Sequence, residues 1–529
     1  MIRILAALCL LAWGVGSTGS AVAFDNTLRV SSTLPLDIGE YEPNQTIYTV
    51  HQEISPLLFP RLVRSGPSGG WVGEAARSWF TGDDGHSLHF RLRDDLRWSN
   101  GKPVTAEDFA RAFRRMLHPL SPKRNLLMFI RNAGDYDVER NISRATISTS
   151  GPYELVLGLD YPSAGHIDSI GATYLVAIPE GMDEEPSWLD AGSRRVTGGP
   201  FRPVSVTGTE MLLDRDENNP LSADIQVDRI CIRHVDMATA ISDYVSDHAD
   251  LLLGPLGNQR NWLLNRLSTD TQKDTGARMY MAIIHRNSRV LGDRNVRRAL
   301  SLALDRETFG RNLFGKTFAL PVGIIPDGIS GYVADASVVN PTPRTYEDRL
   351  DLAKELIAGS GYDASNPIRI RLIYASQVNG YREIASFLKA SWKNIHVDLD
   401  ISTVEDFWKS IDIFNKSSYD VVISSTFDEM PLNYLESLLS KTFASRLYVN
   451  PELQELRHAV SAAVGDEQRM KGLQAFDRYI TQTFAAIPIA TDRTVLFAKP
   501  YVDTSMSRSP VFRISHARLV PEKIPAERP

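Results

Sequence analysis

The chain has 529 residues, of which 43% are hydrophobic and 23% are charged, a balance that is ordinary for a soluble globular protein. The length suggests roughly three domain-sized units of about 150 residues each. The formal net charge of −6 gives no sign of the basic face that nucleic-acid binding requires, so we expect no nucleic-acid partner.

Residues 1–23 have the three parts of a secretory signal peptide. Arg3 supplies the positive charge, residues 4–15 form the apolar core, and Ala21-Val22-Ala23 is a small-residue cleavage site. The alternative is an ordinary buried N-terminal helix. The apolar run is too short for a transmembrane helix, and no later segment is long enough to span a bilayer. We therefore expect residues 1–23 to be cleaved and the protein to be exported to the periplasm.

The two cysteines exclude an intramolecular disulfide in the mature protein. Cys9 lies inside the signal peptide, which leaves only Cys231. A large core must therefore hold the fold together. Because Leu8 precedes Cys9 in the middle of the signal, the segment lacks a lipobox. We expect a soluble periplasmic protein without a lipid anchor.

Residues 91–119 predict a strand, a turn and a helix, in that order. The turn falls at Asn100-Gly101, a pair that tolerates positive φ. Thr105 caps the helix, with Asp108 at the third helical position as in a capping box. Apolar residues then recur at helical spacing from Phe109 to Met116 and would bury one face.

The later segments differ between the two halves of the chain. Residues 153–160 and 210–215 predict strands without long helices between them, which is typical of a mixed α+β region. After residue 290 the pattern alternates between period two and helical spacing, which favours an α/β region. The predicted helices of this half lie near residues 296–304, 350–357 and 384–388, and its strands near 368–374, 397–401 and 419–423.

Several short strings resemble those of the periplasmic peptide-binding proteins of ABC importers, also called extracellular solute-binding protein family 5. The segment from Trp98 to Phe109 is similar to the family's "W-S-[ND]-G-x-P-[VL]-T-A-x-D-F". Further strings follow in the family's order over nearly the whole mature chain. They are Ile54 to Val63, Glu74 to Trp79, Thr197 to Phe201, Tyr244 to Asp250, Asn295 to Arg306, Leu352 to Gly361 and Tyr419 to Val421.

The resemblance implies an α/β fold of the two-lobed, periplasmic binding protein type II-like class, with an additional inserted α+β domain. Lobe I would comprise residues 24–52, 196–275 and 487–529, and the inserted domain residues 53–195. Lobe II, an α/β lobe, would run over residues 276–486. The ligand would lie between the lobes, which close about a hinge.

The function implied by the resemblance is that of a solute receptor, not an enzyme. It would bind oligopeptides and deliver them to an inner-membrane ABC permease, as a monomer and without a cofactor. The alternative is the same role for another solute, such as a murein peptide, haem, a metal chelate or an opine, because one fold hosts several ligands. A secreted hydrolase is a further alternative.

A receptor for peptides of varied sequence has to recognise their backbone and their charged ends. The family places an Asp after a "G-W-x-x-D" element to bind the ligand ammonium, and the similar segment here contains Asp428, with Phe427 or Thr426 near the family's tryptophan. The Gly-Trp pair itself is absent. Asp428 could instead cap or turn the loop that follows.

Three further residues are candidates for the ligand site. Phe407 or Trp408 lies near a family aromatic residue that lines the cleft, although packing on a helix face would explain either one. His285 opens lobe II where the family approaches the cleft, although a solvated polar turn is the alternative. Ile423 stands where some peptide binders place an Arg for the ligand carboxylate. Carboxylate binding would therefore lie elsewhere or be absent.

Other chemistry has no visible basis in the sequence. No Cys/His cluster, Walker-type loop or H-E-x-x-H string occurs, so we expect no metal site. His86 and His89 are three residues apart on a predicted strand and would face opposite sides. No G-x-S-x-G string supplies a nucleophile, which argues against the hydrolase.

Overall fold

A computed structural model gives the three-dimensional structure of the chain. It describes residues 26–36, 43–44, 49–66, 71–119, 121, 124–137, 142–161, 165–172, 175–182, 196–254, 259–267, 271–285, 288–329, 332–334, 345–376, 378, 380–405, 413, 419–428, 431, 434, 451–463, 466–504 and 514–524. The predicted signal peptide lies outside this part. Among the helices described, none is both long and apolar enough to cross a bilayer.

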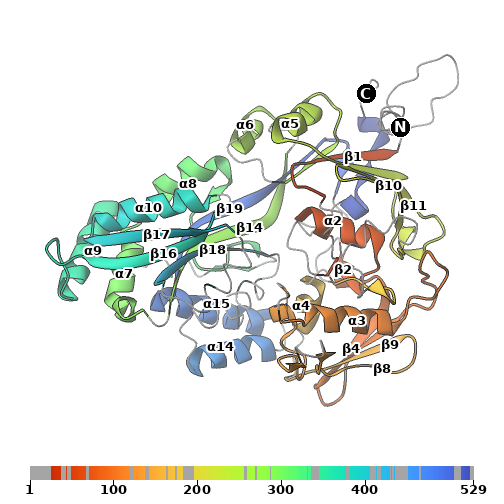
Figure 1. Cartoon of the computed structure of the whole chain (residues 1–529), viewed down its shortest axis with the longest axis horizontal. Coiled ribbons are helices and arrows are strands. Elements are labelled where there is room, and N and C mark those ends of the chain that lie inside the picture. Colours follow the sequence, from red (N-terminus) through yellow and green to blue (C-terminus); the bar gives the residue numbers. More distant parts are fainter. Residues whose placement is uncertain are drawn as a thin grey trace.

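One sheet of 11 described strands runs through both halves of the molecule (Figure 1). Its order is β10-β11-β12-β1-β13-β19-β14-β18-β16-β17, with β15 beside β19. The strands are β1 (Thr27–Ser32), β10 (Phe201–Val206), β11 (Glu210–Arg215), β12 (Arg229–His234), β13 (Leu251–Leu253), β14 (Thr271–Ile284), β15 (Phe318–Ala319), β16 (Ile368–Ala375), β17 (Val397–Val404), β18 (Val421–Asp428) and β19 (Ala486–Ala498).

Two long strands, β14 and β19, link the halves of this sheet. The first residues of β14, Thr271–Lys273, pair with β19 at residues 495–497, where β19 also pairs with β13. After a shift in register, β14 continues from Ala277 along the other half of β19 and along β18. The two halves therefore share these crossing strands, and we call the halves lobe I and lobe II.

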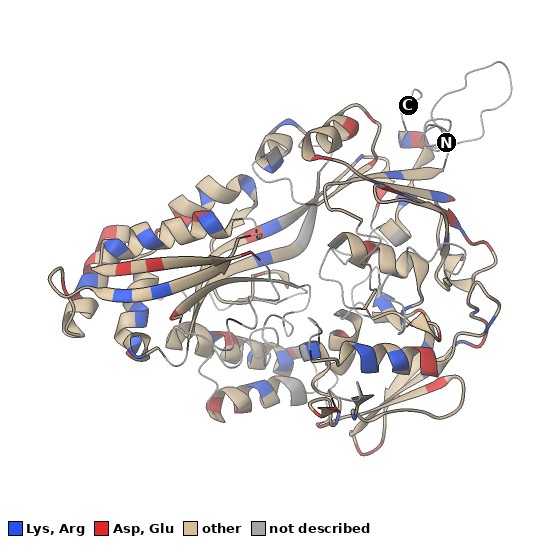
Figure 2. Cartoon of the chain, in the orientation of Figure 1, with Lys and Arg blue, Asp and Glu red and all other residues tan. Residues whose placement is uncertain are grey.

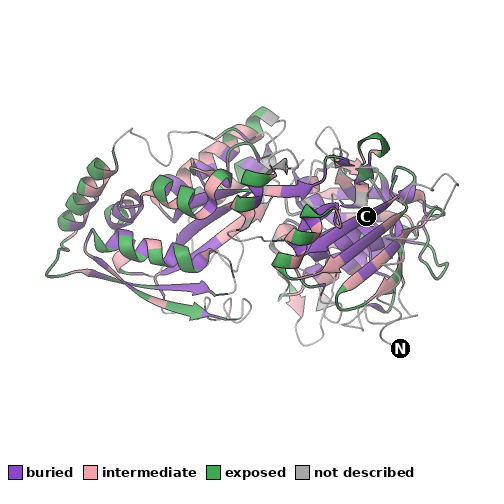
Figure 3. Cartoon of the chain, turned by 90° about the horizontal axis from the view of Figure 1, so that it is seen from above, coloured by how far each residue is buried: buried purple, intermediate pink, exposed green. Residues whose placement is uncertain are grey.

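Lobe II is a sheet covered by helices on both faces. Along β14 successive side chains point to opposite faces, so Tyr280 and Ala282 enter one buried cluster, whereas Met279 and Met281 enter another. Figure 3 shows the buried strands between the helices. The helices are α7 (Arg294–Leu302), α8 (Arg306–Phe314), α9 (Tyr346–Gly359), α10 (Tyr381–Lys393), α14 (Pro451–Ala462) and α15 (Asp466–Thr483).

Lobe I carries three described helices on its part of the large sheet and ends in a small hairpin. The helices are α2 (Thr49–Leu58), α5 (Met237–Val245) and α6 (Gln259–Arg266), and the hairpin pairs β20 (Val502–Asp503) with β21 (Arg518–Leu519). Cys231 is buried in β12. Short 3-10 helices occur at Arg124–Leu127, Pro220–Ser222, Val290–Gly292, Gly315–Thr317, Ile514–His516 and Pro521–Lys523.

Between α2 and β10 the chain forms a second, antiparallel sheet with the order β4-β5-β9-β8. This segment lies below lobe I in Figure 1 and has the α+β character expected of the inserted domain. Its elements are β2 (Val63–Ser65), β3 (Trp71–Gly73), β4 (Ala76–Thr81), β5 (Ser87–Leu92), α3 (Ala106–Met116), β6 (Tyr136–Asp137), β7 (Ile142–Ser143), β8 (Ile147–Thr149), β9 (Glu154–Gly158) and α4 (His166–Ala172).

The inserted segment and lobe I share one continuous buried cluster, which includes Phe113 of α3 and Ile230 of β12. The predicted domain limits at residues 53, 195, 275 and 487 therefore remain predictions. The expected turn and helix are confirmed: Gly101 has φ +84°, and α3 begins after Thr105. The preceding strand is shorter than expected, because β5 ends at Leu92.

Candidate ligand-binding site

The candidate site lies at the end of β18, next to the strands that cross between the lobes. β18 pairs with β14 along its whole length, from Val421 opposite Ile284 to Asp428 opposite Ala277. Its other edge pairs with β16 only at Val421 and Val422. The described pairing of this edge therefore stops at Val422.

Three predicted site residues occupy this edge. Thr426 and Phe427 are half-buried, and Asp428 ends the strand. The guanidinium of Arg278 lies 5.5 Å from the centre of the Phe427 ring, at a distance typical of a cation–π contact. The side chain of Asp428 lies outside the described part of the structure.

The other predicted site residues do not gather at this edge. His285 follows the opposite end of β14. It lies about 23 Å from Arg278, the partner of Phe427, at about 3.3 Å per residue. Its buried backbone N–H donates to the carbonyl of Asp420 over 2.8 Å, and its ring lies against Tyr419. Phe407 and Trp408 lie outside the described residues.

The structure adds polar neighbours that the sequence analysis missed. Arg278 Nη1 donates to Ser425 Oγ over 3.2 Å, and the Tyr381 hydroxyl donates to the same oxygen over 3.0 Å. Burial raises the pKa of Tyr280, the next residue on this face of β14, to about 12. One signal could have identified Arg278: it is the only charged residue in the run Ala277–Ile284.

A second polar group lies across β14 from Phe427, since Arg278 pairs with Phe427 on one side and with Asp492 on the other. The carboxylate of Asp492, on β19, accepts a hydrogen bond from Arg260 Nη1 over 2.8 Å and from Thr317 Oγ1 over 2.6 Å. Arg260 belongs to α6 of lobe I, whereas Thr317 belongs to lobe II. Through Asp492, these bonds link α6 of lobe I to Thr317 of lobe II beside the crossing strands.

Charge and pocket geometry limit the chemistry of the remaining surface. Figure 2 shows acidic and basic residues interspersed over the described elements of both lobes. The described residues contain no group of three His, Cys, Asp or Glu side chains that could hold a metal ion.

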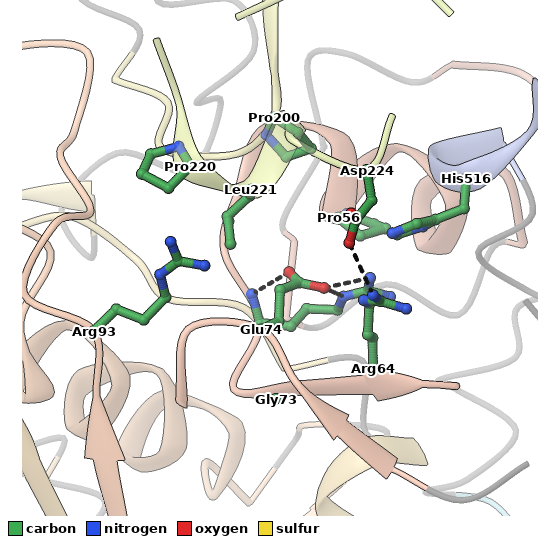
Figure 4. Close-up of a pocket in the computed structure, with 11 residues that line it drawn as sticks. Pro56, Arg64, Gly73, Glu74, Arg93, Pro200, Pro220, Leu221, Asp224 and His516 are labelled. Atoms are coloured by element: carbon green, nitrogen blue, oxygen red, sulfur yellow. Dashed lines mark hydrogen bonds and ion pairs between the residues drawn. The ribbon is translucent and has the colours of Figure 1, made fainter. Parts of the chain in front are cut away.

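A polar pocket lies between the inserted segment and lobe I, where Glu74 accepts hydrogen bonds from Arg61 (Figure 4). Its volume is about 60 Å³. Pockets for drug-sized ligands measure about 300–1,000 Å³, so this one is too small for a peptide. It lies in lobe I and the inserted segment, away from β18.

Comparison with known proteins identifies the family. Residues 70–445 match the middle region of the bacterial extracellular solute-binding proteins, family 5. The periplasmic oligopeptide-binding protein of Haemophilus influenzae is 24% identical over 497 residues, which cover 89% of each chain. A probable deoxycholate-binding periplasmic protein of Escherichia coli is 23% identical over 490 residues, covering 88% of each.

Solved structures show the same fold. The murein tripeptide-binding protein of Escherichia coli superposes with a TM-score of 0.77 at 19% identity, over 94% of this chain and 99% of that one. The expected two-lobed fold class with its inserted α+β segment is thereby confirmed. On the family match and this fold, the chain belongs to the bacterial extracellular solute-binding proteins of family 5.

Proposed function

We propose that the protein is the periplasmic solute-binding component of an ABC importer and that it binds oligopeptides between lobe I and lobe II. The observation that carries this proposal is the edge of β18 beyond Val422, where the pairing with β16 stops, in a chain of solute-binding family 5. An extended peptide can add to such an edge through backbone hydrogen bonds, which depend little on its sequence. This is the recognition that a general peptide receptor needs.

The proposal assigns roles to the residues at this edge. Phe427 packs against the peptide, and Asp428 binds its ammonium group. A charge-assisted hydrogen bond of this kind strengthens when closure of the lobes removes water. The lobes close by bending β14 and β19 near residues 274–276, where their register shifts.

The remaining parts of the proposal concern export and partners. Residues 1–23 act as a cleaved signal peptide, and the mature protein works as a monomer with an inner-membrane permease. It performs no catalysis. The limits of lobe I, the inserted domain and lobe II are those expected from the sequence.

A thermal-shift screen of the mature protein tests the ligand class. Pools of di- to decapeptides are compared with deoxycholate, the ligand that the name of one relative suggests. We expect a peptide pool to stabilise the protein, by about 2.7 kcal/mol for a peptide at 100 times its Kd. Stabilisation by deoxycholate with no response to any peptide would replace peptides by another solute.

A second arm of the same test addresses Asp428. In Asp428→Asn, affinity for a free-amine peptide should fall about tenfold to 100-fold, because a hydrogen bond to a charged group contributes about 1.5–3 kcal/mol. Affinity for the N-acetylated peptide should change little. Glu429→Gln is the matched control: a selective loss in that variant instead would assign the ammonium contact to Glu429.

A further inference from the structure

A second connection between the lobes lies away from the crossing strands. Asp168 of α4, in the inserted segment, pairs with Arg469 of α15, in lobe II, with 2.6 Å between Oδ2 and Nη1. These residues are 301 positions apart in the chain. Figure 1 shows α4 beside α15, whereas β14 and β19 cross above them. The body formed by lobe I and the inserted segment, which share one core, therefore touches lobe II on both sides.

The Asp168 carboxylate is held in place by other residues of the inserted segment. Asp168 Oδ1 accepts a hydrogen bond from Trp71 Nε1 over 2.8 Å. Gly171, one turn further along α4, leaves the space that the Trp71 ring occupies. The Asp168 side chain is only 11% exposed, whereas that of Arg469 is 24% exposed. Because these contacts already order the Asp168 carboxylate, formation of the ion pair with Arg469 costs little further side-chain entropy at Asp168.

An aromatic contact lies beside the ion pair. The ring of Tyr161, in the inserted segment, meets His458 of α14 edge to face, with 5.5 Å between centroids. Tyr161 also lies 5.1 Å from His166 of α4, and its carbonyl oxygen is 2.9 Å from His166 Nε2. Like Asp168, Tyr161 is supported by residues of the inserted segment, and its partner His458 belongs to lobe II.

We infer that the Asp168–Arg469 and Tyr161–His458 contacts form an interlobe latch, which must separate before a ligand can enter or leave. This inference rests on the proposed binding between the lobes. A solute enclosed between bodies that touch on both sides leaves only when one side opens, and the covalent crossing strands cannot separate. The latch residues are positioning residues: they contact no ligand, and they set the lifetime of the complex through the population of the closed state.

The test uses Arg469→Gln, Asp168→Asn and the double variant. Stopped-flow dissociation of a fluorescent peptide should be about threefold to tenfold faster in each single variant, the effect of losing a partly buried ion pair. The double variant should be no faster than either single one, because the two residues form one interaction. In ligand-free protein, small-angle scattering should give a larger radius of gyration for all three.

Two further variants separate the latch from general effects on stability. Arg215→Gln removes an ion pair of the same length within lobe I, 2.6 Å from the more exposed Asp228, and should leave both dissociation and radius of gyration unchanged. His458→Ala changes an exposed residue that can be replaced without loss of folding, and should also accelerate dissociation.

The outcomes distinguish this inference from the proposed function. If no peptide binds to the wild-type protein, the proposed function fails, and the scattering comparison alone decides whether the latch holds the lobes together. Unchanged radii of gyration in Arg469→Gln and Asp168→Asn would overturn the latch. So would unchanged dissociation rates in variants that bind peptide.

Discussion

His516 shows how the pocket between the inserted segment and lobe I affects a single titratable residue. Burial, and then the positive charges of Arg61 and Arg64, lower the pKa of His516 to about 3 (Figure 4). In the unfolded chain its pKa would be about 6.5. The imidazole is therefore neutral in the folded protein at pH values where the unfolded chain already binds a proton.

This difference predicts a loss of stability in acid. Above pH 6.5 both states are neutral at His516, and the residue has no effect. As the pH falls, protonation stabilises only the unfolded chain until about pH 3, so its contribution between pH 7 and pH 5 is a loss of about 2 kcal/mol. Denaturant unfolding of His516→Gln should show a pH dependence smaller by this amount. An identical pH dependence in both proteins would contradict the low pKa.

Residues of the candidate site show where sequence reasoning reached its limit. The β-branched residues predicted a strand near residues 419–423, whereas β18 runs from Val421 to Asp428 and so includes Thr426 and Phe427. His285 was a separate candidate, because the family resemblance places it where lobe II opens toward the cleft. Once β14 and β18 are antiparallel, His285 lies beside the start of β18 and away from its end.

At the scale of elements, two of the strings that carry the family resemblance meet in space. The backbone N–H of Ser99 donates to the carbonyl of Thr197, and Thr197 N–H donates back to Ser99 Oγ over 3.1 Å. Gly199 lies against the backbone of Leu57 to Phe59, where a Cβ would lie 2.5 Å from the Leu57 carbonyl oxygen. These strings join the inserted segment to lobe I.

Asp108 connects this junction to the start of α3. Its Oδ2 accepts hydrogen bonds from the Thr105 backbone N–H over 2.8 Å and from Trp98 Nε1 over 3.1 Å. Asp108→Ala would remove the cap and leave the buried indole N–H without its acceptor. We expect the free energy of unfolding to fall by about 2–3 kcal/mol.

Chemical denaturation measures this loss, and Glu107→Ala is the matched control. Glu107 is the preceding residue of the same helical turn, and its ion pair with Arg114 is exposed. Its replacement should change stability by no more than about 0.5 kcal/mol. Equal effects of both substitutions would mean that Asp108 acts only through helix propensity.

At the scale of the whole molecule, single elements could be predicted from the sequence, whereas the connections between the lobes could not. Periodicity predicted α7, β16 and β17, because each places one regular apolar stripe on a core. It did not predict that β14 runs for 14 residues through both lobes. Both faces of its second half are buried, so the segment lacks the alternation that identifies a strand. The discontinuity of lobe I followed from the family resemblance alone.

The separate cores predict a ligand-dependent change in unfolding. One buried cluster serves the inserted segment and most of lobe I, and two others serve lobe II, with the crossing strands between them. Calorimetry of the ligand-free protein should therefore show two overlapping transitions, since each core melts with its own stability. Saturating peptide binds both lobes together and should merge the transitions at a higher temperature. A single ligand-free transition with equal calorimetric and van't Hoff enthalpies would mean that the crossing strands and interlobe contacts already couple the cores into one cooperative unit.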